Sequence, residues 1–266
     1  MKVSFIGGGN MGEAILSAIL SNELCQQQAI FVSDVSETRY RHLEREYGVS
    51  VSNDNRLIAE KGDVVVLAVK PQNLAPVMTE LKGRLKPSQL VLSILAGTRI
   101  DTLCRGLNHR CIVRAMPNTP TQIGQGMTVW TGTLKVTEPQ KAWAAAILGV
   151  MGKEIYVADE KYLDMATAVS GSGPAYVFLL IESLVSAAVH IGIPRNTAQE
   201  LVLQTLLGSG QFLQKSGKSA AELRKMVTSR GGTTAEALSH LEKGDFTGLV
   251  IRAVVAAYEK AKKLGS

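Results

Sequence analysis

The chain opens with M-K-V-S-F-I-G-G-G-N-M-G, residues 1–12. The apolar run at residues 3–6 predicts a strand, and the apolar run at residues 14–20 predicts a helix. Between them, Gly7 permits a tight turn, Gly9 lets a pyrophosphate approach the backbone, and Gly12 lets the helix pack against the strand. We therefore predict a dinucleotide-binding turn, with the phosphates at the helix N-terminus. A merely flexible glycine loop would not explain the apolar runs on both sides.

Length and composition fit a packed globular protein. The 266 residues suffice for one large domain or two ordinary ones, and 45% of them are hydrophobic against 20% charged. The formal net charge of +6 suits anionic small molecules, but the basic residues are scattered and form no dense Lys/Arg run. We therefore expect no nucleic-acid partner.

Cysteine and histidine usage predicts neither a disulfide framework nor a metal site. The three cysteines, Cys25, Cys104 and Cys111, include no C-x-x-C pair, and the four histidines lie far apart in the sequence. Reduced cysteines are typical of the cytoplasm. Since a strand is already predicted at Val3, we expect no signal peptide and a cytoplasmic location.

Strands and helices alternate through the first half of the chain. Residues 63–69 form a continuous run rich in β-branched side chains, which is typical of a central parallel strand buried on both faces. Further strands are expected at residues 29–34, 90–95, 111–115, 126–130 and 154–157, and helices at residues 37–47 and 74–81. The alternation predicts an α/β fold with a Rossmann-type doubly wound parallel sheet. Ligands bind beyond the carboxyl ends of such strands, so the loops at residues 7–12, 70–72, 96–98 and 117–120 should converge on one crevice.

Asp34 ends one of these β-rich runs and lies 22 positions beyond Gly12. An acid at about this place binds the ribose 2′-hydroxyl of NAD and repels the 2′-phosphate of NADP. Arg39, Ser33 and Ser36 are nearby, however, and such residues can hold a 2′-phosphate. The sequence favours NAD at this position and leaves NADPH open.

From Asp159 onward the strand signal disappears. We therefore place a Rossmann dinucleotide-binding domain at residues 1–158 and an all-α domain at residues 159–266. Helices are expected at residues 160–169, 174–191, 194–215, 219–227, 234–241 and 246–263. Residues 174–191 are apolar nearly all round, and such a helix must be covered on all sides. A small helical domain struggles to do this alone, so we expect a dimerisation domain whose helices share a core with a second copy. Residues 175–193 include Glu182 and His190, and we expect a buried helix there and no membrane span.

A second glycine stretch, T-S-R-G-G-T-T at residues 228–234, precedes another predicted helix. Its backbone N–H groups can cradle a carboxylate. The spacing of Thr233 and Glu236 predicts a capping box, as does that of Ser219 and Glu222. If Thr233 caps the helix, its hydroxyl is occupied and Thr234 is left free to face a ligand. The alternative is a plain turn between two helices.

With these segments assembled, the sequence resembles the pyrroline-5-carboxylate reductase family over its whole length. The resemblance rests on F-I-G-G-G-N-M-G (5–12), A-V-K-P-Q (68–72), M-P-N-T-P (116–120), S-G-S-G-P-A-Y (170–176) and G-G-T-T (231–234). It implies a Rossmann domain and an all-α dimerisation domain that interlocks into a homodimer, often assembled further into decamers. It also implies reduction of a small cyclic imino acid, 1-pyrroline-5-carboxylate, to L-proline with NADPH or NADH, which is the last step of proline biosynthesis.

The resemblance implies roles for individual residues as well. The pyrophosphate would lie on the glycine turn, and the ribose and nicotinamide would lie along the neighbouring strand ends. The implied cofactor-binding residues are Gly7, Gly9, Asn10, Met11, Gly12, Ala68, Val69, Lys70, Pro71 and Asn118, and Asp34 joins them because of its spacing from the glycine turn. The implied substrate-binding residues, supplied by the partner subunit, are Ser229, Gly231, Gly232, Thr233 and Thr234. We expect Thr234 to be catalytic, with its hydroxyl bonded to the ring nitrogen and helping the proton relay.

Two positions depart from the family pattern. Arg230 stands where the family usually has proline, and its charge can lie near the substrate carboxylate. Asp34 stands where many members carry serine, threonine or a basic residue, which puts the usual NADPH preference in doubt.

Two alternative functions fit parts of the pattern. The β-hydroxyacid dehydrogenases share the two-domain plan, but they place a lysine on the long helix after a glycine-rich motif. Residues 175–179, A-Y-V-F-L, contain no lysine, which speaks against alcohol oxidation. A nucleotide-binding module without activity would not explain the strand-end loops together with G-G-T-T. An iminium carbon is already electrophilic, so the predicted reduction needs positioning and no metal.

Overall fold

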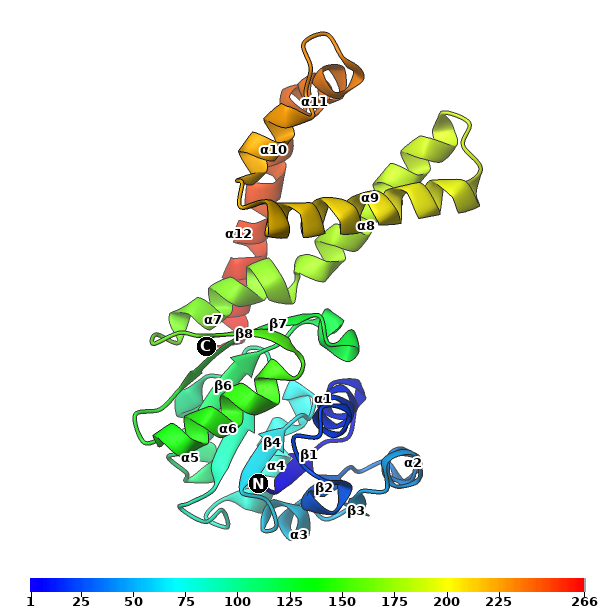
Figure 1. The fold of residues 1–266 in the computed structure, drawn as a ribbon. Helices are drawn as coiled ribbons and strands as arrows, with labels where there is room; N and C mark the ends of the chain where they lie inside the picture. The colour runs from blue at the N-terminus through cyan, green and yellow to red at the C-terminus, as the bar shows by residue number, and fades with distance from the viewer. Residues whose placement is uncertain (266) are drawn as a thin grey trace. The chain divides into compact units, whose positions relative to one another are not determined.

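The computed structural model describes residues 1–265, and its chain divides into two compact units (Figure 1). One unit comprises Met1–Pro174 together with the chain from Ala256 onward, and the other is Ala175–Val255. The last part of the chain therefore returns to the first unit. The domain boundary expected between residues 158 and 159 stays a prediction.

The first unit contains an eight-stranded sheet with the strand order β3-β2-β1-β4-β5-β6-β7-β8. The strands are β1 Val3–Ile6, β2 Ile30–Ser33, β3 Ser50–Ser52, β4 Val64–Leu67, β5 Leu90–Ser93, β6 Ile112–Met116, β7 Gly126–Gly132 and β8 Gly152–Tyr156. From β1 the chain runs outward through β2 and β3, and then outward on the other side from β4. The order therefore reverses between β1 and β4, where a doubly wound sheet binds its ligand.

The prediction of a parallel sheet is confirmed except at one pair, because β6 and β7 are antiparallel. Only a short 3-10 turn, Thr119–Ile123, joins these two strands. A parallel return needs a crossover of a dozen or more residues, so the chain can only turn back on itself here. The following strand, β8, again pairs parallel to β7 after a helical crossover.

Helices cover both faces of the sheet (Figure 1). They are α1 Asn10–Ser21, α2 Glu37–Tyr47, α3 Asn55–Ala59, α4 Leu74–Leu81, α5 Ile100–Leu107 and α6 Glu138–Gly149. On one face, Phe5 and Val66 of the central strands pack in a core with side chains of α1, α2 and α6. On the other face, Ile6 and Leu67 pack with side chains of α3, α4 and α5. Successive strand residues thus face opposite cores, which explains the near-continuous apolar strands.

A buried ion-pair network holds the start of α7, Lys161–Ala166, against the sheet. The guanidinium of Arg114 on β6 is only 2% exposed and lies 2.8 Å from the carboxylate of Glu160 and 2.9 Å from that of Asp164. Both acids compensate the buried charge, which would otherwise be very costly. A π-helical turn, Thr167–Gly171, follows α7, so the continuous helix predicted at residues 160–169 is interrupted there.

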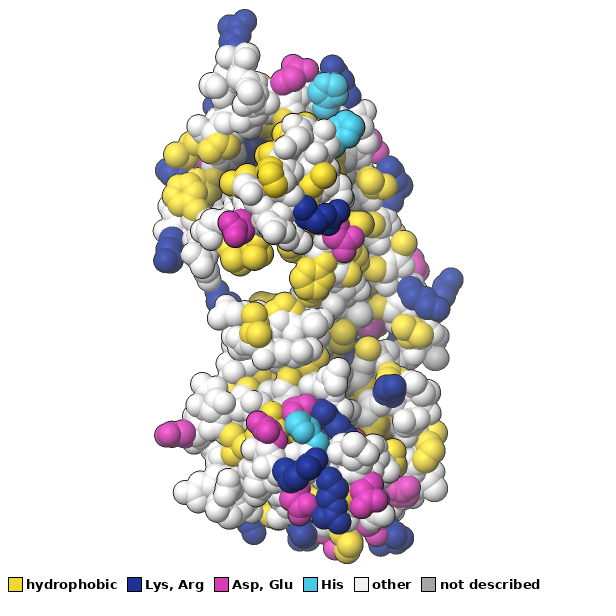
Figure 2. Space-filling view, turned by 90° about the vertical axis from the view of Figure 1, so that its right-hand side faces the viewer, with side chains coloured by type: hydrophobic (Ala, Val, Ile, Leu, Met, Phe, Trp, Pro, Cys, Tyr) yellow, Lys and Arg dark blue, Asp and Glu magenta, His cyan; other side chains and the backbone are white. Residues whose placement is uncertain are grey.

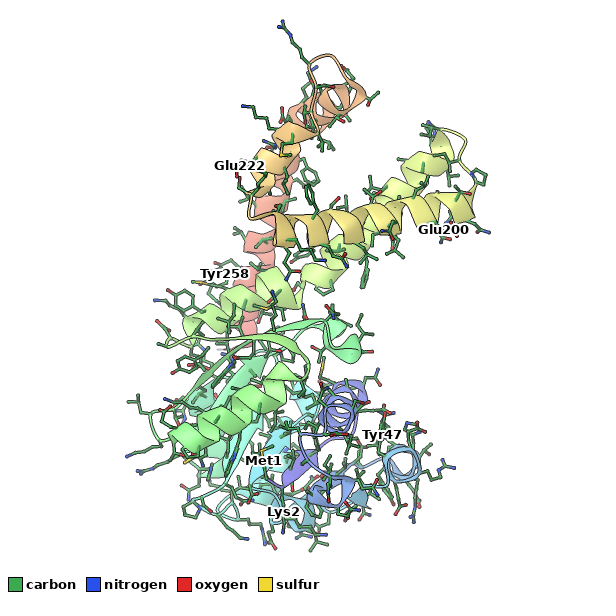
Figure 3. All side chains as sticks on the ribbon, in the orientation of Figure 1. Met1, Lys2, Tyr47, Glu200, Glu222 and Tyr258 are labelled. Atoms are coloured by element: carbon green, nitrogen blue, oxygen red, sulfur yellow. The ribbon has the colours of Figure 1, made fainter. Side chains whose placement is uncertain are left out.

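The second unit is helical. It contains α9 Arg195–Ser216, α10 Ala220–Met226 and α11 Thr233–Lys243, together with most of α8 Gly173–His190 and the first half of α12 Phe246–Leu264. Val185 of α8 packs with Ala198 and Val202 of α9 in a small apolar cluster. The predicted capping box of α10 is confirmed, because Ser219 accepts from the N–H of Glu222 while the Glu222 carboxylate accepts from the N–H of Ser219. Glu222 is labelled in Figure 3.

Within the single chain, α8 is not the buried helix that its sequence predicts. Val185 is its only buried residue among those described, while Phe178 and Leu179 are 55% and 64% exposed. Many apolar side chains lie at the molecular surface (yellow in Figure 2). By length and composition alone, the helical segment Lys161–His190, which includes the π-helical turn, could cross a membrane, and only 6% of its most apolar window is buried. An apolar surface of this size needs a covering partner.

Candidate active site

The three glycines of the turn between β1 and α1 differ in the space that a side chain would find there. Gly7 has φ +100°, and a Cβ added there would lie 2.8 Å from the carbonyl carbon of Ala68. A Cβ on Gly12 would lie 2.5 Å from the carbonyl oxygen of Gly7. A Cβ on Gly9 would meet no atom within 4 Å. The backbone at Gly9 is therefore open to a ligand, whereas Gly7 and Gly12 are required for close packing.

A cleft of about 540 Å³ lies at the carboxyl ends of β1, β2 and β4. Six of the predicted cofactor residues line it: Gly7, Gly9, Asp34, Ala68, Val69 and Lys70. The other lining residues are Ser33, Val35, Asn55, Asn73, Pro76, Val77 and Glu80. Asn10, Met11, Gly12, Pro71 and Asn118, which were predicted with the first set, are not among the residues that line this cleft. Asn10 and Met11 begin α1, and Pro71 begins the 3-10 turn Pro71–Asn73 beside the cleft.

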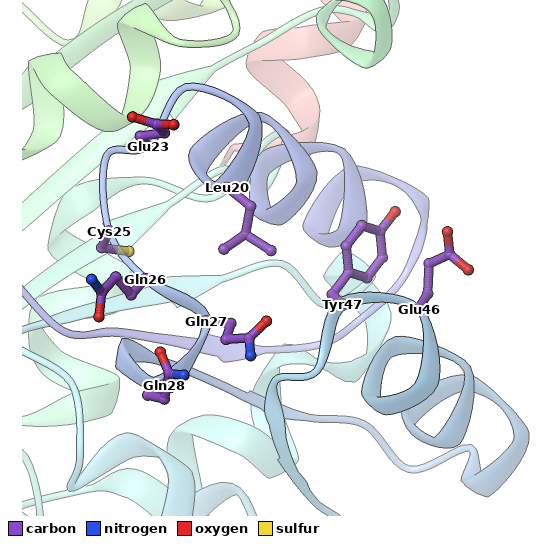
Figure 4. Close-up of a pocket in the computed structure, with 8 residues that line it drawn as sticks. All are labelled: Leu20, Glu23, Cys25, Gln26, Gln27, Gln28, Glu46 and Tyr47. Atoms are coloured by element: carbon purple, nitrogen blue, oxygen red, sulfur yellow. The ribbon is translucent and has the colours of Figure 1, made fainter.

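A larger cavity of about 830 Å³ lies elsewhere on the first unit (Figure 4). Its lining includes Cys25, three glutamines just before β2, and Tyr47 at the end of α2. It therefore lies at the amino end of β2, opposite the strand ends at which doubly wound sheets bind ligands. It contains none of the predicted site residues, and we assign the dinucleotide to the smaller cleft.

Asp34 follows β2 directly, and both of its carboxylate oxygens hold backbone N–H groups. Oδ2 accepts from the N–H of Gly8 at 2.8 Å, and Oδ1 accepts from the N–H of Ser36 at 2.9 Å. The carboxylate thus connects the end of β2 to the glycine turn after β1. It is half-buried in the cleft wall, which is the place predicted for a ribose ligand.

The side chain of Arg39 on α2 is bound to other groups of the protein. Its Nε donates to the carbonyl oxygen of Gly8, and its guanidinium forms an ion pair with Glu13 of α1. Glu13 also contacts Nε2 of His42 at 2.9 Å and accepts from the Tyr47 hydroxyl at 3.1 Å. Burial raises the pKa of Glu13, but the hydrogen bonds from His42, Arg39 and Tyr47 outweigh it, so this pKa lies below its usual value. The positive charge of Arg39 is therefore compensated by Glu13, and this ion pair joins α2 to α1.

Asn118 joins three segments by its side-chain amide. Its Oδ1 accepts from the N–H of Met127 on β7 at 2.9 Å, and its Nδ2 donates to the carbonyl oxygen of Ser170 in the π-helical turn at 3.0 Å. The loop after β6 is thereby fixed to β7 and to the segment that leads into α8. The structure thus shows a structural use for this side chain, while its cofactor contact stays a prediction.

The turn at residues 96–98 does not line the cleft, contrary to prediction. Gly97 has φ +68°, and a Cβ added there would lie 2.8 Å from the Cβ of Leu264. The end of α12 thus packs on this turn, where the absence of a side chain makes room for it. Sequence patterns do not show that a segment from the far end of the chain covers a strand-end loop.

The second glycine turn leads into α11. Gly231 has φ +71°, and the N–H of Gly232 donates to the carbonyl oxygen of Ser229 at 3.1 Å. Gly232, not Thr233, is the N-cap residue, and it has no side chain with which to cap. The capping box predicted for Thr233 and Glu236 is therefore wrong, because Thr233 is already the first helical residue.

The adjacent threonines Thr233 and Thr234 differ in exposure and not in capping. The Thr233 hydroxyl is not used as a cap, so capping no longer distinguishes it from Thr234. Exposure does distinguish them, because Thr234 is half-buried and lines a small cavity between α9, α10 and α11, whereas Thr233 is exposed. The first N–H groups of α11 have no intrahelical partner, as in any helix.

Comparisons with known proteins assign this pair of glycine turns to one family. Residues 160–264 match the family model described as pyrroline-5-carboxylate reductase dimerisation, and residues 2–97 match that described as NADP oxidoreductase, coenzyme F420-dependent. The pyrroline-5-carboxylate reductase of Synechocystis sp. is 40% identical over 265 residues, which cover 100% of this chain and 98% of that protein. The chain belongs to the pyrroline-5-carboxylate reductase family. The Escherichia coli reductase is 37% identical over 99% of this chain and 98% of its own length.

Solved structures agree with this assignment. A pyrroline-5-carboxylate reductase from Coxiella burnetii has a TM-score of 0.93 at 38% identity, covering 100% of this chain and 98% of that chain. The reductase of Plasmodium falciparum, solved with NADP bound, has a TM-score of 0.90 at 35% identity with the same coverage.

Family membership confirms the predicted function and fold class. This reductase is an NAD(P)H-dependent oxidoreductase of proline biosynthesis, with a mostly parallel α/β domain followed by a helical dimerisation domain. The dimerisation domain makes it a homo-oligomer and accounts for the exposed apolar side chains of α8.

Two residues that line the cleft were not predicted from the sequence. Asn55 at the start of α3 and Glu80 of α4 line the cleft together with Asp34, and neither was singled out. Ser33 donates to Asn55, and Asn55 donates to Glu80 at 2.7 Å. The short elements β3 and α3 carry too few residues to show a period, but Asp54 before Asn55 is a helix N-cap that marks the segment.

Proposed function

We propose that the cleft at β1, β2 and β4 holds the nicotinamide dinucleotide of the reaction. The observation that carries this assignment is the open space beside Gly9, flanked by the crowded Gly7 and Gly12. The residues fit the group: backbone N–H groups at the start of α1 suit a pyrophosphate, and Asp34 suits a ribose hydroxyl. The pyrophosphate would be surrounded by Gly7, Gly9, Asn10, Met11 and Gly12. The ribose and nicotinamide part of the dinucleotide would be held or supported by Ala68, Val69, Lys70, Pro71 and Asn118. When bound, the dinucleotide supplies the hydride that reduces the C=N bond.

The substrate, 1-pyrroline-5-carboxylate, would bind at the second glycine turn. Its carboxylate would accept from the backbone N–H groups of residues 231–234, which lie at the positive end of α11. Ser229 and Arg230 would border this anion site. Through dimerisation, the partner subunit's helical domain would supply these residues to the dinucleotide site, so that residues 1–158 and 159–266 act across two chains.

Thr234 would be the catalytic residue. Its hydroxyl is placed in the first turn of α11, one residue beyond the glycines, where it can hydrogen-bond the ring nitrogen. The nitrogen gains basicity as the C=N bond is reduced, and the Thr234 Oγ would pass it a proton that comes from water or substrate. The chain's contribution is therefore to position two reactants, exclude water and hold one proton.

The experiment that tests this function is NAD(P)H consumption with 1-pyrroline-5-carboxylate, measured for both nucleotides. Thr234→Ala should lower kcat about tenfold to hundredfold, because one such contact contributes roughly 1.5–3 kcal/mol. Thr234→Ser, which keeps the hydroxyl, should retain most of the activity, and Thr234→Val should behave like Thr234→Ala. Wild-type kinetics in Thr234→Ala would reject the role.

Assembly and location complete the proposal. We propose a homodimer as the smallest active form, and the family resemblance allows decamers built from such dimers. The scattered basic residues and the three free cysteines support a cytoplasmic enzyme without a nucleic-acid or membrane partner.

A further inference from the structure

We propose that Asp34 selects the dinucleotide and that this reductase prefers NADH to NADPH. The inference rests on the dinucleotide site proposed above and adds which of the two nucleotides it takes. Three observations support it: the orientation of Asp34, the engagement of Arg39, and the charges along the cleft wall.

The Asp34 carboxylate is held in place before any ligand arrives. Each oxygen accepts one backbone N–H, from Gly8 at 2.8 Å and from Ser36 at 2.9 Å. A carboxylate can accept about four hydrogen bonds, so two acceptor positions are left for the ribose hydroxyls. Since Gly8 belongs to the glycine turn, this bond holds the acid beside the proposed pyrophosphate site. NADH offers a 2′-hydroxyl donor there, whereas NADPH offers only a phosphate.

The cations that could hold a 2′-phosphate near Asp34 are already paired. Arg39 binds the Gly8 carbonyl oxygen and the Glu13 carboxylate. Arg56, on the neighbouring helix α3, forms a two-pronged contact with Asp54, with its Nε at 2.9 Å and its terminal nitrogen at 2.8 Å from the carboxylate oxygens. Releasing Arg39 would break bonds that join α2 to the glycine turn and to α1, so Arg39 is not available at low cost. The Arg56–Asp54 pair is exposed and local, so it holds Arg56 only weakly.

The charge balance of the cleft wall also disfavours a phosphate. Among the described residues that line the cleft, Asp34 and Glu80 are acidic and Lys70 is the one cation. Glu80 is tied to the same end of the cleft through Asn55 at 2.7 Å. Lys70 follows β4, and two strand spacings separate the ends of β2 and β4, about 10 Å in all. A 2′-phosphate carries a charge of roughly −1.5 to −2 at pH 7, so placing it beside Asp34 brings like charges together.

The test measures binding as well as turnover. Dissociation constants for NADH and NADPH come from nucleotide fluorescence, and those for AMP and 2′,5′-ADP come from competition. We expect NADH to bind at least about tenfold more tightly than NADPH, and AMP more tightly than 2′,5′-ADP. Asp34→Ser should reduce the preference for NADH over NADPH, and that for AMP over 2′,5′-ADP, about tenfold or more. Asp34→Asn keeps an acceptor for the Gly8 N–H, so a similar shift in this variant shows that charge and not a loosened turn is responsible.

Arg39→Gln is the matched control. The substitution removes the hydrogen bond to the Gly8 carbonyl oxygen, so it should weaken the binding of NADH and of NADPH by the same factor. The ratio of the two dissociation constants should stay unchanged. A selective loss of NADPH binding in Arg39→Gln or in Lys70→Met would show a phosphate ligand and overturn the inference. Tighter NADPH binding by the wild-type chain would also overturn it. Turnover of 1-pyrroline-5-carboxylate with NADPH alone would reject only this inference, whereas binding of neither nucleotide would reject the proposed dinucleotide site.

Discussion

Gly9 and Gly12 lie three residues apart, yet a methyl group would meet different surroundings at each. At Gly12 it would lie 2.5 Å from a backbone oxygen, and at Gly9 it would meet nothing within 4 Å. Gly12→Ala should therefore destabilise the protein by about 1–3 kcal/mol through overpacking, measured as the free energy of unfolding in urea. Gly9→Ala should cost under about 1 kcal/mol of stability but weaken NADH binding at least about tenfold, because the methyl would occupy the space proposed for the pyrophosphate.

The pair of variants separates folding from binding at one turn. Wild-type affinity in Gly9→Ala would show that the phosphates do not approach the backbone there. An equal loss of stability in both variants would show that the turn is strained as a whole.

Single residues also show where sequence reasoning ends. Spacing alone placed Asp34 beside the glycine turn, and the structure confirms that location. The same reasoning left Arg39 open as a phosphate ligand, because its ion pair with Glu13 joins residues 26 positions apart. Asn55 and Glu80 were missed for a similar reason: they reach the cleft only once β3 and α3 have formed.

At the scale of elements, a threonine hydroxyl at the start of a helix stabilises the protein only where it caps that helix. Thr137 caps α6 in a complete capping box, with its own N–H bonded to Gln140 at 3.0 Å. Thr233, with the same spacing to an acid, is the first residue of α11 and caps nothing. Thr137→Ala should lower the free energy of unfolding by about 1 kcal/mol, while Thr233→Ala should leave it within roughly 0.5 kcal/mol of wild type. Chemical unfolding of both variants provides the comparison, and equal losses would contradict the assigned caps.

Most helices were predictable, and the shortest elements were not. The bounds predicted for α2 and α4 agree with the structure, because apolar spacing and flanking residues mark both ends. The helix α3 and the strand β3 were not predicted, since five and three residues carry little periodicity. The helix α5 was also not predicted, although it is as long as α4. The antiparallel β7 was predicted as a strand, but its direction depends on the short turn before it.

At the scale of the whole molecule, the helical unit depends on a second copy. Its described apolar cluster holds three buried side chains, while α8, α9 and α12 expose many large apolar ones. Leu179→Glu, at an exposed position of α8, should therefore convert the oligomer to monomers in sedimentation experiments and abolish turnover. Lys218→Glu, a charge change in the turn before α10, should leave the assembly intact. Thermal unfolding of the wild type should shift upward with protein concentration, as linked association requires.

Two outcomes would argue against this dependence. A wild-type chain that is monomeric by light scattering at micromolar concentration would reject the shared core. An intact oligomer in Leu179→Glu would place the contact on other helices.

The contact between Leu264 and Gly97 has a consequence for the order of events during synthesis. Residues from Ala256 onward belong to the first unit, although they leave the ribosome after every strand of its sheet. The sheet can form as its strands emerge, but the turn after β5 stays bare until α12 has been synthesised. The first unit is therefore completed only after the helical unit between its two segments has been made, and a chain cut short within α12 would leave that turn exposed to proteases.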